Sequence, residues 1–88
     1  MEIVKIASAG TMESSDAYVE IEPAEKLSVQ LESVVQQQFG EEIHRVVLEV
    51  LQENGVEKAS VRVIDRGALE CVIRARVETA IVRGKGDA

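Results

Sequence analysis

The one histidine, His44, and the one cysteine, Cys71, are the first candidates for a catalytic base and a catalytic nucleophile, since the sixteen carboxylates form no pair that the sequence can place. A nucleophile needs a base within hydrogen-bond distance and a third group that orients the base. Neither residue has such partners at helical spacing. We therefore predict that His44 lies on a helix surface or boundary and that Cys71 is a packed, inert thiol. One histidine and one cysteine are also too few for a zinc site, so we assign no catalytic residue and no metal ligand.

The remaining cluster of unusual residues runs from Gly10 to Asp16, with the sequence Gly-Thr-Met-Glu-Ser-Ser-Asp. It lies between two predicted strands, where a serine hydroxyl would be exposed on a rigid scaffold and within reach of a modifying enzyme. The ordinary alternative is a loop in which the Ser and Asp side chains form local hydrogen bonds with the backbone. The residue types alone leave both alternatives open.

Three strands are predicted in the first part of the chain. Ile3–Ala7 is a short apolar run that stops at small residues. Ala17–Glu22 alternates apolar and polar side chains until Pro23, which lacks the N–H that a strand ladder needs. Leu27–Glu32 alternates in the same way. The short link between the last two strands predicts an antiparallel hairpin.

Helical spacing of apolar residues predicts a helix over Glu41–Glu53, which starts as early as Val34 if Ser33 and Gln36 form a capping box. A fourth strand, a turn and a second helix follow over Ala59–Ile64, Asp65–Gly67 and Ala68–Val82. The apolar helical positions, which we expect to be buried, are Phe39, Ile43, Val46, Val47, Val50 and Leu51 in the first helix and Leu69, Val72, Ile73, Ala80 and Ile81 in the second.

This order of elements predicts an α+β fold, with a small, mostly antiparallel sheet of about four strands and two helices packed on one face (βββαβα). We expect one domain over residues 1–88, with residues 84–88 as a flexible tail. The outer face of the sheet should be polar, since alternation directs these side chains away from the core: Tyr18, Glu20, Glu22, Gln30 and Glu32.

The composition argues against several classes of protein. The net charge is −6 and the pI is near 4.7, so the basic surface that binds nucleic acid or anionic membranes is missing. No apolar run reaches the ~20 residues of a membrane span. Tyr18 and Phe39 are the only aromatic residues, which disfavours binding of bases by stacking. A reduced, cytoplasmic protein fits these features best.

Three segments resemble the acyl carrier proteins of citrate lyase, the gamma subunits. These segments are Ala9–Asp16, Gln38–Gly40 and Asp65–Arg76. They occur in the family's order and at matching separations, and the resemblance covers nearly the whole chain.

The resemblance implies that Ser14 carries a phosphoribosyl-dephospho-CoA group, a CoA derivative, through a phosphodiester bond. Ser15 is the weaker candidate, because the following position tolerates glycine in the family. The resemblance further implies a non-catalytic subunit whose arm presents acetyl and citryl thioesters. Its partners would be the alpha (acyl transferase) and beta (citryl lyase) subunits, which cleave citrate to acetate and oxaloacetate, and a prosthetic-group transferase.

Two alternatives to this function remain at this point. One is the acyl carrier subunit of malonate decarboxylase, and the other is a cofactor-free α+β interaction module. Two roles are also open for Glu13 and Asp16, which flank Ser14. Their charges either repel the phosphates of the arm or only solubilise and cap the loop.

Overall fold

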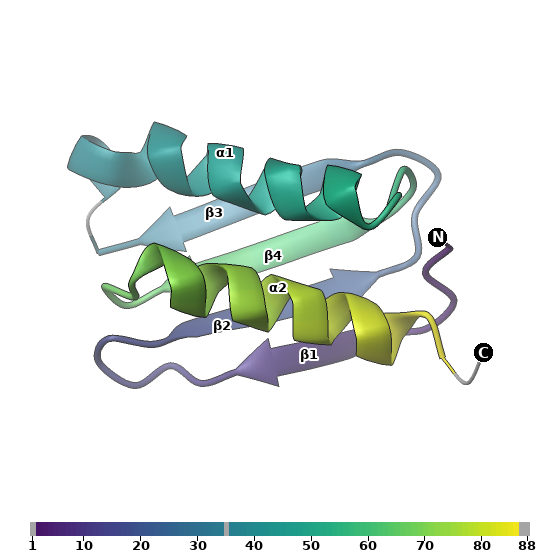
Figure 1. The fold of residues 1–88 in the computed structure, drawn as a ribbon, viewed down its shortest axis with the longest axis horizontal. Coiled ribbons are helices and arrows are strands. Elements are labelled where there is room, and N and C mark those ends of the chain that lie inside the picture. The colour runs from purple at the N-terminus through teal and green to yellow at the C-terminus, as the bar shows by residue number, and fades with distance from the viewer. Residues whose placement is uncertain (1, 35, 87–88) are drawn as a thin grey trace.

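The computed structural model describes residues 2–34 and 36–86. These residues form a four-stranded sheet with two helices, in the order βββαβα (Figure 1). The elements are β1 (Ala7–Gly10), β2 (Ala17–Glu22), β3 (Ser28–Ser33), α1 (Gln36–Glu53), β4 (Ser60–Asp65) and α2 (Glu70–Gly84). The predicted α+β class and element order are confirmed.

The strands lie side by side in the order β1-β2-β4-β3. The β1–β2 and β2–β4 pairs are antiparallel, and β3 is parallel to β4. The predicted hairpin of the second and third strands is therefore wrong, because β4 lies between them (Figure 1). β4 buries Val61 and Val63 on the face toward the helices and Ile64 on the other face, whereas β3 exposes Gln30 and Glu32. The more apolar strand takes the centre and the more polar one an edge.

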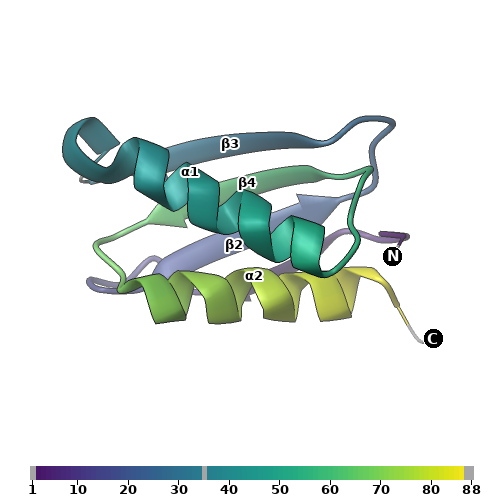
Figure 2. The same cartoon turned by 45° about the horizontal axis from the view of Figure 1, so that its top comes forward.

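Both helices cover the same face of the sheet (Figure 2). The link from β3 through α1 to β4 is a crossover between parallel strands, which requires a long connection such as a helix. Between the layers lies an aliphatic core that includes Val19, Ile21, Val46, Val47, Val50, Leu51, Val61, Val63, Val77 and Ile81, each at most 1% exposed. Neither helix of residues 2–34 and 36–86 is long and apolar enough to cross a membrane.

The first strand begins later than predicted. β1 starts at Ala7, and the residues before it run past the end of α2. The backbone N–H groups of Val4 and Lys5 donate to the carbonyl oxygen of Gly84 at 2.9 and 3.2 Å. The side chain of Ile3 is buried, while Val4 is exposed. Ile6 is exposed as well, so of these three apolar residues only Ile3 is buried, against the end of α2.

The end of α2 also differs from the prediction. The predicted flexible tail includes Gly84, but this glycine is the last residue of α2 and is buried. A Cβ atom at Gly84 would lie 3.1 Å from Ile21 and 3.3 Å from Ile3, so the helix packs closely on the core here. Flexibility of the residues after Gly84 stays a prediction, and Asp87 and Ala88 lie outside the described residues.

Both helices also begin at positions other than those predicted. α1 starts at Gln36, and α2 starts at Glu70 rather than at Ala68. Two apolar side chains that we expected to be buried, Phe39 and Leu69, are 53% and 72% exposed. Leu69 is the residue before the helix and not part of its buried face.

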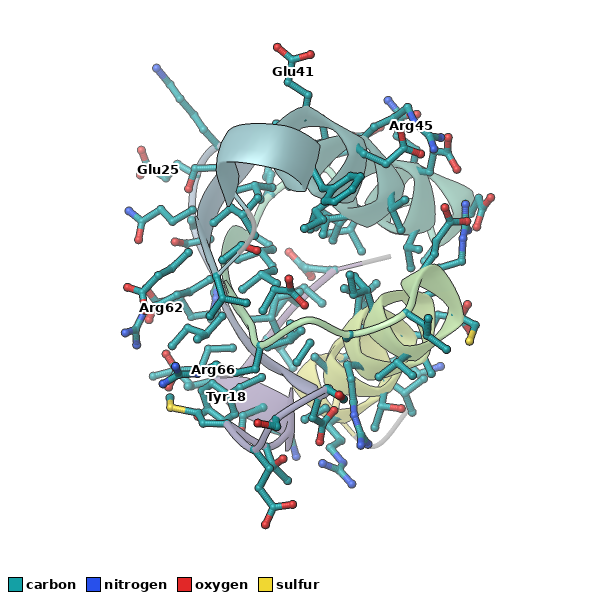
Figure 3. All side chains as sticks on the ribbon, turned by 90° about the vertical axis from the view of Figure 1, so that its left-hand side faces the viewer. Tyr18, Glu25, Glu41, Arg45, Arg62 and Arg66 are labelled. Atoms are coloured by element: carbon teal, nitrogen blue, oxygen red, sulfur yellow. The ribbon has the colours of Figure 1, made fainter. Side chains whose placement is uncertain are left out.

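The uncovered face of the sheet is polar, as expected, but mixed in charge. Glu20 accepts a hydrogen bond from the Tyr18 hydroxyl at 2.9 Å and pairs with Arg62 at 3.4 Å. Figure 3 looks along the sheet and shows Tyr18, Arg62 and Arg66 on the side away from the helices. The carboxylates on this face are therefore partly balanced by arginines.

Candidate functional site

The loop between β1 and β2 carries Ser14 at one end of the sheet. The strand register places Gly10 beside Tyr18, and Asp65 beside both Ala17 and Ser33. The β1–β2, β3–α1 and β4–α2 connections therefore meet at the same end, on the left of Figure 1. Ser14 is exposed there, so a modifying enzyme can reach its hydroxyl.

Asp16 is the centre of the hydrogen bonds that hold this loop. Its Oδ2 accepts from the Thr11 hydroxyl at 2.6 Å, and its Oδ1 accepts from the N–H of Ala17 at 2.7 Å. Arg76 of α2 approaches with both arms of its guanidinium, Nε to Oδ1 at 3.0 Å and Nη2 to Oδ2 at 3.1 Å. Thr11 first, then Arg76 and Ala17, lower the pKa of the Asp16 carboxyl from 3.8 to about 2. Asp16 is therefore a paired, capping carboxylate.

Backbone hydrogen bonds join the loop to the β4–α2 connection. The N–H of Ser15 donates to the carbonyl of Arg66 at 2.8 Å, and the N–H of Arg66 donates to the carbonyl of Asp16 at 2.9 Å. Within the loop, the N–H of Asp16 donates to the carbonyl of Glu13 at 3.1 Å. Ser14 thus lies in a turn in which the residues before and after it, Glu13 and Ser15, both form backbone hydrogen bonds.

Two residues of this segment have unusual backbone angles. Gly10 has φ +92°, and a Cβ atom there would lie 1.9 Å from the carbonyl oxygen of Ala17. Ser15 has φ +68°, in the left-handed region where glycine is the least strained residue. This backbone angle is one that glycine adopts without strain, which fits the expectation that the position of Ser15 tolerates glycine.

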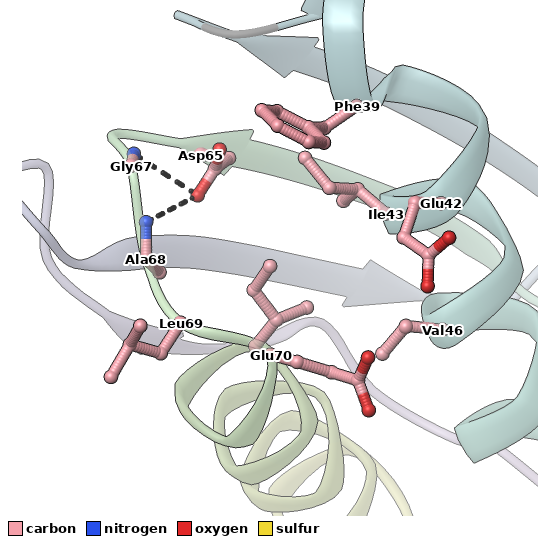
Figure 4. Close-up of a pocket in the computed structure, with 10 residues that line it drawn as sticks. Phe39, Glu42, Ile43, Val46, Asp65, Gly67, Ala68, Leu69 and Glu70 are labelled. Atoms are coloured by element: carbon pink, nitrogen blue, oxygen red, sulfur yellow. Dashed lines mark hydrogen bonds between the residues drawn. The ribbon is translucent and has the colours of Figure 1, made fainter.

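Asp65 organises the neighbouring connection. Its carboxylate is 1% exposed, and it accepts hydrogen bonds from the Ser33 hydroxyl at 2.8 Å, from Gly67 N–H at 3.2 Å and from Ala68 N–H at 2.9 Å. Figure 4 shows the last two bonds. Sequence reasoning identified Asp65 only as a turn residue. The signal that it missed is an aspartate followed by glycine two residues later, which is typical of a side chain that caps its own turn.

A cavity of about 330 Å³ lies between the first turns of the two helices and this connection (Figure 4). Phe39 and Leu69 line it from α1 and from the start of α2, and Ile43, Val46 and Ile73 form its apolar interior. This cavity explains why two apolar side chains predicted to be buried are partly open to solvent.

The structure keeps the other candidate residues apart from the loop. His44 is exposed on α1, as predicted. Cys71 is also exposed, so the prediction of a packed thiol is wrong. Within residues 2–34 and 36–86, no group of three or more His, Cys, Asp or Glu residues is placed to hold a metal ion.

Arg76 is the residue that sequence reasoning missed. The resemblance included it only as part of a longer segment, without a role. It follows Ile73 and precedes Ala80 at helical spacing, and both of these residues are buried. An arginine next to a buried helical stripe needs a partner for its charge, and Asp16 is that partner.

This chain is similar to known proteins over most of its length. The profile of the ACP family described as malonate decarboxylase delta subunit matches residues 4–84. The citrate lyase acyl carrier protein of Escherichia fergusonii is 54% identical over 85 residues, which cover 94% of this chain and 88% of the relative. The citrate lyase acyl carrier protein of Haemophilus influenzae (strain ATCC 51907) is 47% identical over 88 residues, which cover 100% of this chain and 93% of the relative.

Solved structures show the same fold. A chain in the crystal structure of a Pseudomonas malonate decarboxylase hetero-tetramer in complex with malonate matches with a TM-score of 0.76 at 23% identity, over 90% of this chain and 82% of the other. That likeness extends to the fold alone. The sequence identity to the two citrate lyase carriers is about twice as high and spans nearly the whole chain. The chain belongs to the family of citrate lyase acyl carrier proteins.

Proposed function

We propose that this chain is the acyl carrier subunit of a citrate lyase complex and that Ser14 bears phosphoribosyl-dephospho-CoA through a phosphodiester bond. The observation that carries the proposal is an exposed serine hydroxyl on a loop held by Asp16 and Arg76. A phosphodiester requires a serine oxygen that a donor can approach, and the exposure of Ser14 fits that requirement. The identity to named citrate lyase carriers supports the choice of complex.

The chain acts as a carrier and not as a catalyst in this proposal. When attached, the arm supplies a thiol that holds acetyl and citryl groups as thioesters. Ser14 anchors the arm, and the hydrogen bonds of Asp16 and Ser15 keep the anchor point in place. A tethered arm is delivered intramolecularly, so each docking contact needs only modest affinity.

Ser14 is a better anchor than Ser15, although both are exposed. Ser15 has a left-handed backbone, and its N–H is bonded to Arg66. That geometry favours glycine, which has no hydroxyl to modify. The position of Ser15 therefore serves the shape of the loop, and the position of Ser14 is left for attachment.

The partners that follow from this proposal are the alpha and beta subunits of citrate lyase and the transferase that attaches the arm, in the cytoplasm. A second candidate is the acyl carrier of malonate decarboxylase, which the description of the matching family favours. The acyl group found on the arm distinguishes the two.

The test is the intact mass of the protein purified from its native host during growth on citrate. We expect a mass increase equal to one phosphoribosyl-dephospho-CoA group. It should be lost in Ser14→Ala and kept in Ser15→Ala, which is the matched control. An unmodified chain under these conditions would contradict the proposal, and a malonyl group on the arm would favour the second candidate.

A further inference from the structure

The ion pair of Asp16 and Arg76 joins two distant parts of the chain. The two residues are 60 positions apart in sequence. The Asp16 side chain is 15% exposed and that of Arg76 is 39% exposed. Their bond is bidentate, with one guanidinium nitrogen on each carboxylate oxygen. Paired bonds of this kind fix orientation as well as distance.

This ion pair attaches the Ser14 loop to α2. Asp16 also holds the Thr11 hydroxyl and the Ala17 N–H, so its carboxylate joins the two ends of the loop. Loss of Arg76 leaves the carboxylate joined only to its neighbours in sequence. The loop then keeps its local turn but loses its attachment to α2. α2 packs on the core through Ile73, Val77 and Ala80. The ion pair therefore fixes the position of the loop relative to the packed core.

We propose that Arg76 is a positioning residue for the attachment of the prosthetic group, acting through Asp16 to present the Ser14 hydroxyl to the transferase. This inference rests on the proposed function, because it concerns the reaction that modifies Ser14. It goes further in assigning a role to a helix residue that does not touch the serine.

Transfer of the prosthetic group requires that the Ser14 oxygen is correctly positioned. The Ser14 oxygen forms a bond to a phosphorus atom of a donor activated as a phosphoric anhydride. The bond between that phosphorus and the anhydride oxygen breaks, the leaving phosphate departs with the electron pair, and the hydroxyl proton passes to solvent. The attacking oxygen must lie in line with the leaving group. Small misplacements of a reacting atom can cost about 100-fold in rate.

The experiment measures transfer of the arm to the full-length unmodified chain by its purified transferase, with the anhydride-activated donor, followed by intact mass. We compare wild type with Arg76→Met, Arg76→Lys and the control Arg74→Met. Arg74 lies on the same helix and pairs with Glu49, with Glu53 at 3.5 Å and with Glu70 at 3.4 Å. Its loss therefore removes the same charge but leaves the bonds of Arg76 to Asp16 in place. Thermal melting and amide exchange of Ser15 and Arg66 report whether each variant is folded.

We expect kcat/KM for Arg76→Met to fall by about 10- to 100-fold at a temperature where the variant is fully folded. Arg76→Lys should recover part of the loss in kcat/KM, because lysine keeps the positive charge but cannot form the bidentate pair with the carboxylate. Arg74→Met should match wild type. The single variant Asp16→Asn and the double variant Asp16→Asn/Arg76→Met are also compared. The losses in kcat/KM of the two single variants should not add in the double variant, since both changes remove the same ion pair.

Two results distinguish a failure of the proposed function from a failure of the positioning role of Arg76. If wild type is not modified at Ser14, the proposed function is wrong. If wild type is modified and Arg76→Met has the same kcat/KM, or the double variant shows fully additive losses, the positioning role is overturned.

Discussion

The Ser33 hydroxyl at the end of β3 donates a 2.8 Å hydrogen bond to the buried carboxylate of Asp65 at the end of β4. The two residues are also register partners in the parallel pair of strands. Asp65 uses its other oxygen to bind the backbone of the β4–α2 connection. One carboxylate therefore binds the end of the edge strand β3 and the part of the β4–α2 connection that lines the cavity.

Asp65→Ala should destabilise the protein by about 2–4 kcal/mol, because it removes the shared acceptor of three partly buried hydrogen bonds. Ser33→Ala, which removes a single donor, should cost about 1 kcal/mol. Denaturant unfolding followed by circular dichroism measures both changes. Equal costs for the two variants would show that the backbone bonds of Asp65 contribute little.

Gly10→Ala should destabilise the protein by more than about 2 kcal/mol, because the new Cβ would overlap the Ala17 carbonyl and the backbone has a left-handed φ. Gly67 is a matched control. Its φ of +89° is similar, but a Cβ there meets nothing within 4 Å. Gly67→Ala should therefore cost only about 1 kcal/mol from the backbone angle. Unfolding midpoints that fall equally would contradict the steric argument.

The loop should lose stabilisation only in strong acid. The pKa of Asp16 is lowered from 3.8 to about 2 by Thr11, Arg76 and Ala17. A lowered carboxyl pKa gives a stability contribution that is full above the unfolded value and is lost as pH falls from 3.8 toward about 2. An NMR titration of the Asp16 side chain measures this directly. In Arg76→Met the titration should move to higher pH, and an unchanged titration would argue against the ion pair.

Two apolar residues at the start of α2 should behave in opposite ways. Ile73→Ala should cost about 2–4 kcal/mol, because Ile73 is 2% exposed and its loss leaves a cavity. Leu69→Ala should change stability by less than about 0.5 kcal/mol, because Leu69 is 72% exposed. Chemical denaturation of both variants tests the assignment of the buried helix face. A large loss for Leu69→Ala would mean that its side chain is covered in solution.

The local elements of this fold follow from short-range patterns in the sequence. β2 is bounded as predicted, because its alternation is regular and Pro23 cannot continue a ladder. The buried stripe of α1 from Ile43 to Leu51 also matches its helical spacing. The pairing of strands does not follow from such patterns. β3 and β2 are close in sequence, but β4 lies between them, and the choice of central strand depends on which strand buries most of its side chains in the whole sheet.

The same distinction applies to the candidate site. The exposure of Ser14 and the polar character of its loop could be predicted from residue types and spacing. The contact of Arg76 with Asp16 could not, because it depends on how far α2 lies from the β1–β2 loop in space. The exposure of Leu69 could not be predicted for a related reason, since helical periodicity does not show that the helix begins at Glu70, the residue after Leu69.

The hydrogen bond between Val4 and Gly84 places the beginning and end of the fold side by side. β1 runs from there toward the Ser14 loop, so Val4 and Gly84 lie at the end of the sheet opposite that loop (Figure 1). An affinity tag, a fluorescent label or an immobilising linker at either terminus would therefore point away from the serine. A circular permutant that joins the termini through a short peptide and opens the chain elsewhere should likewise keep the modified end intact.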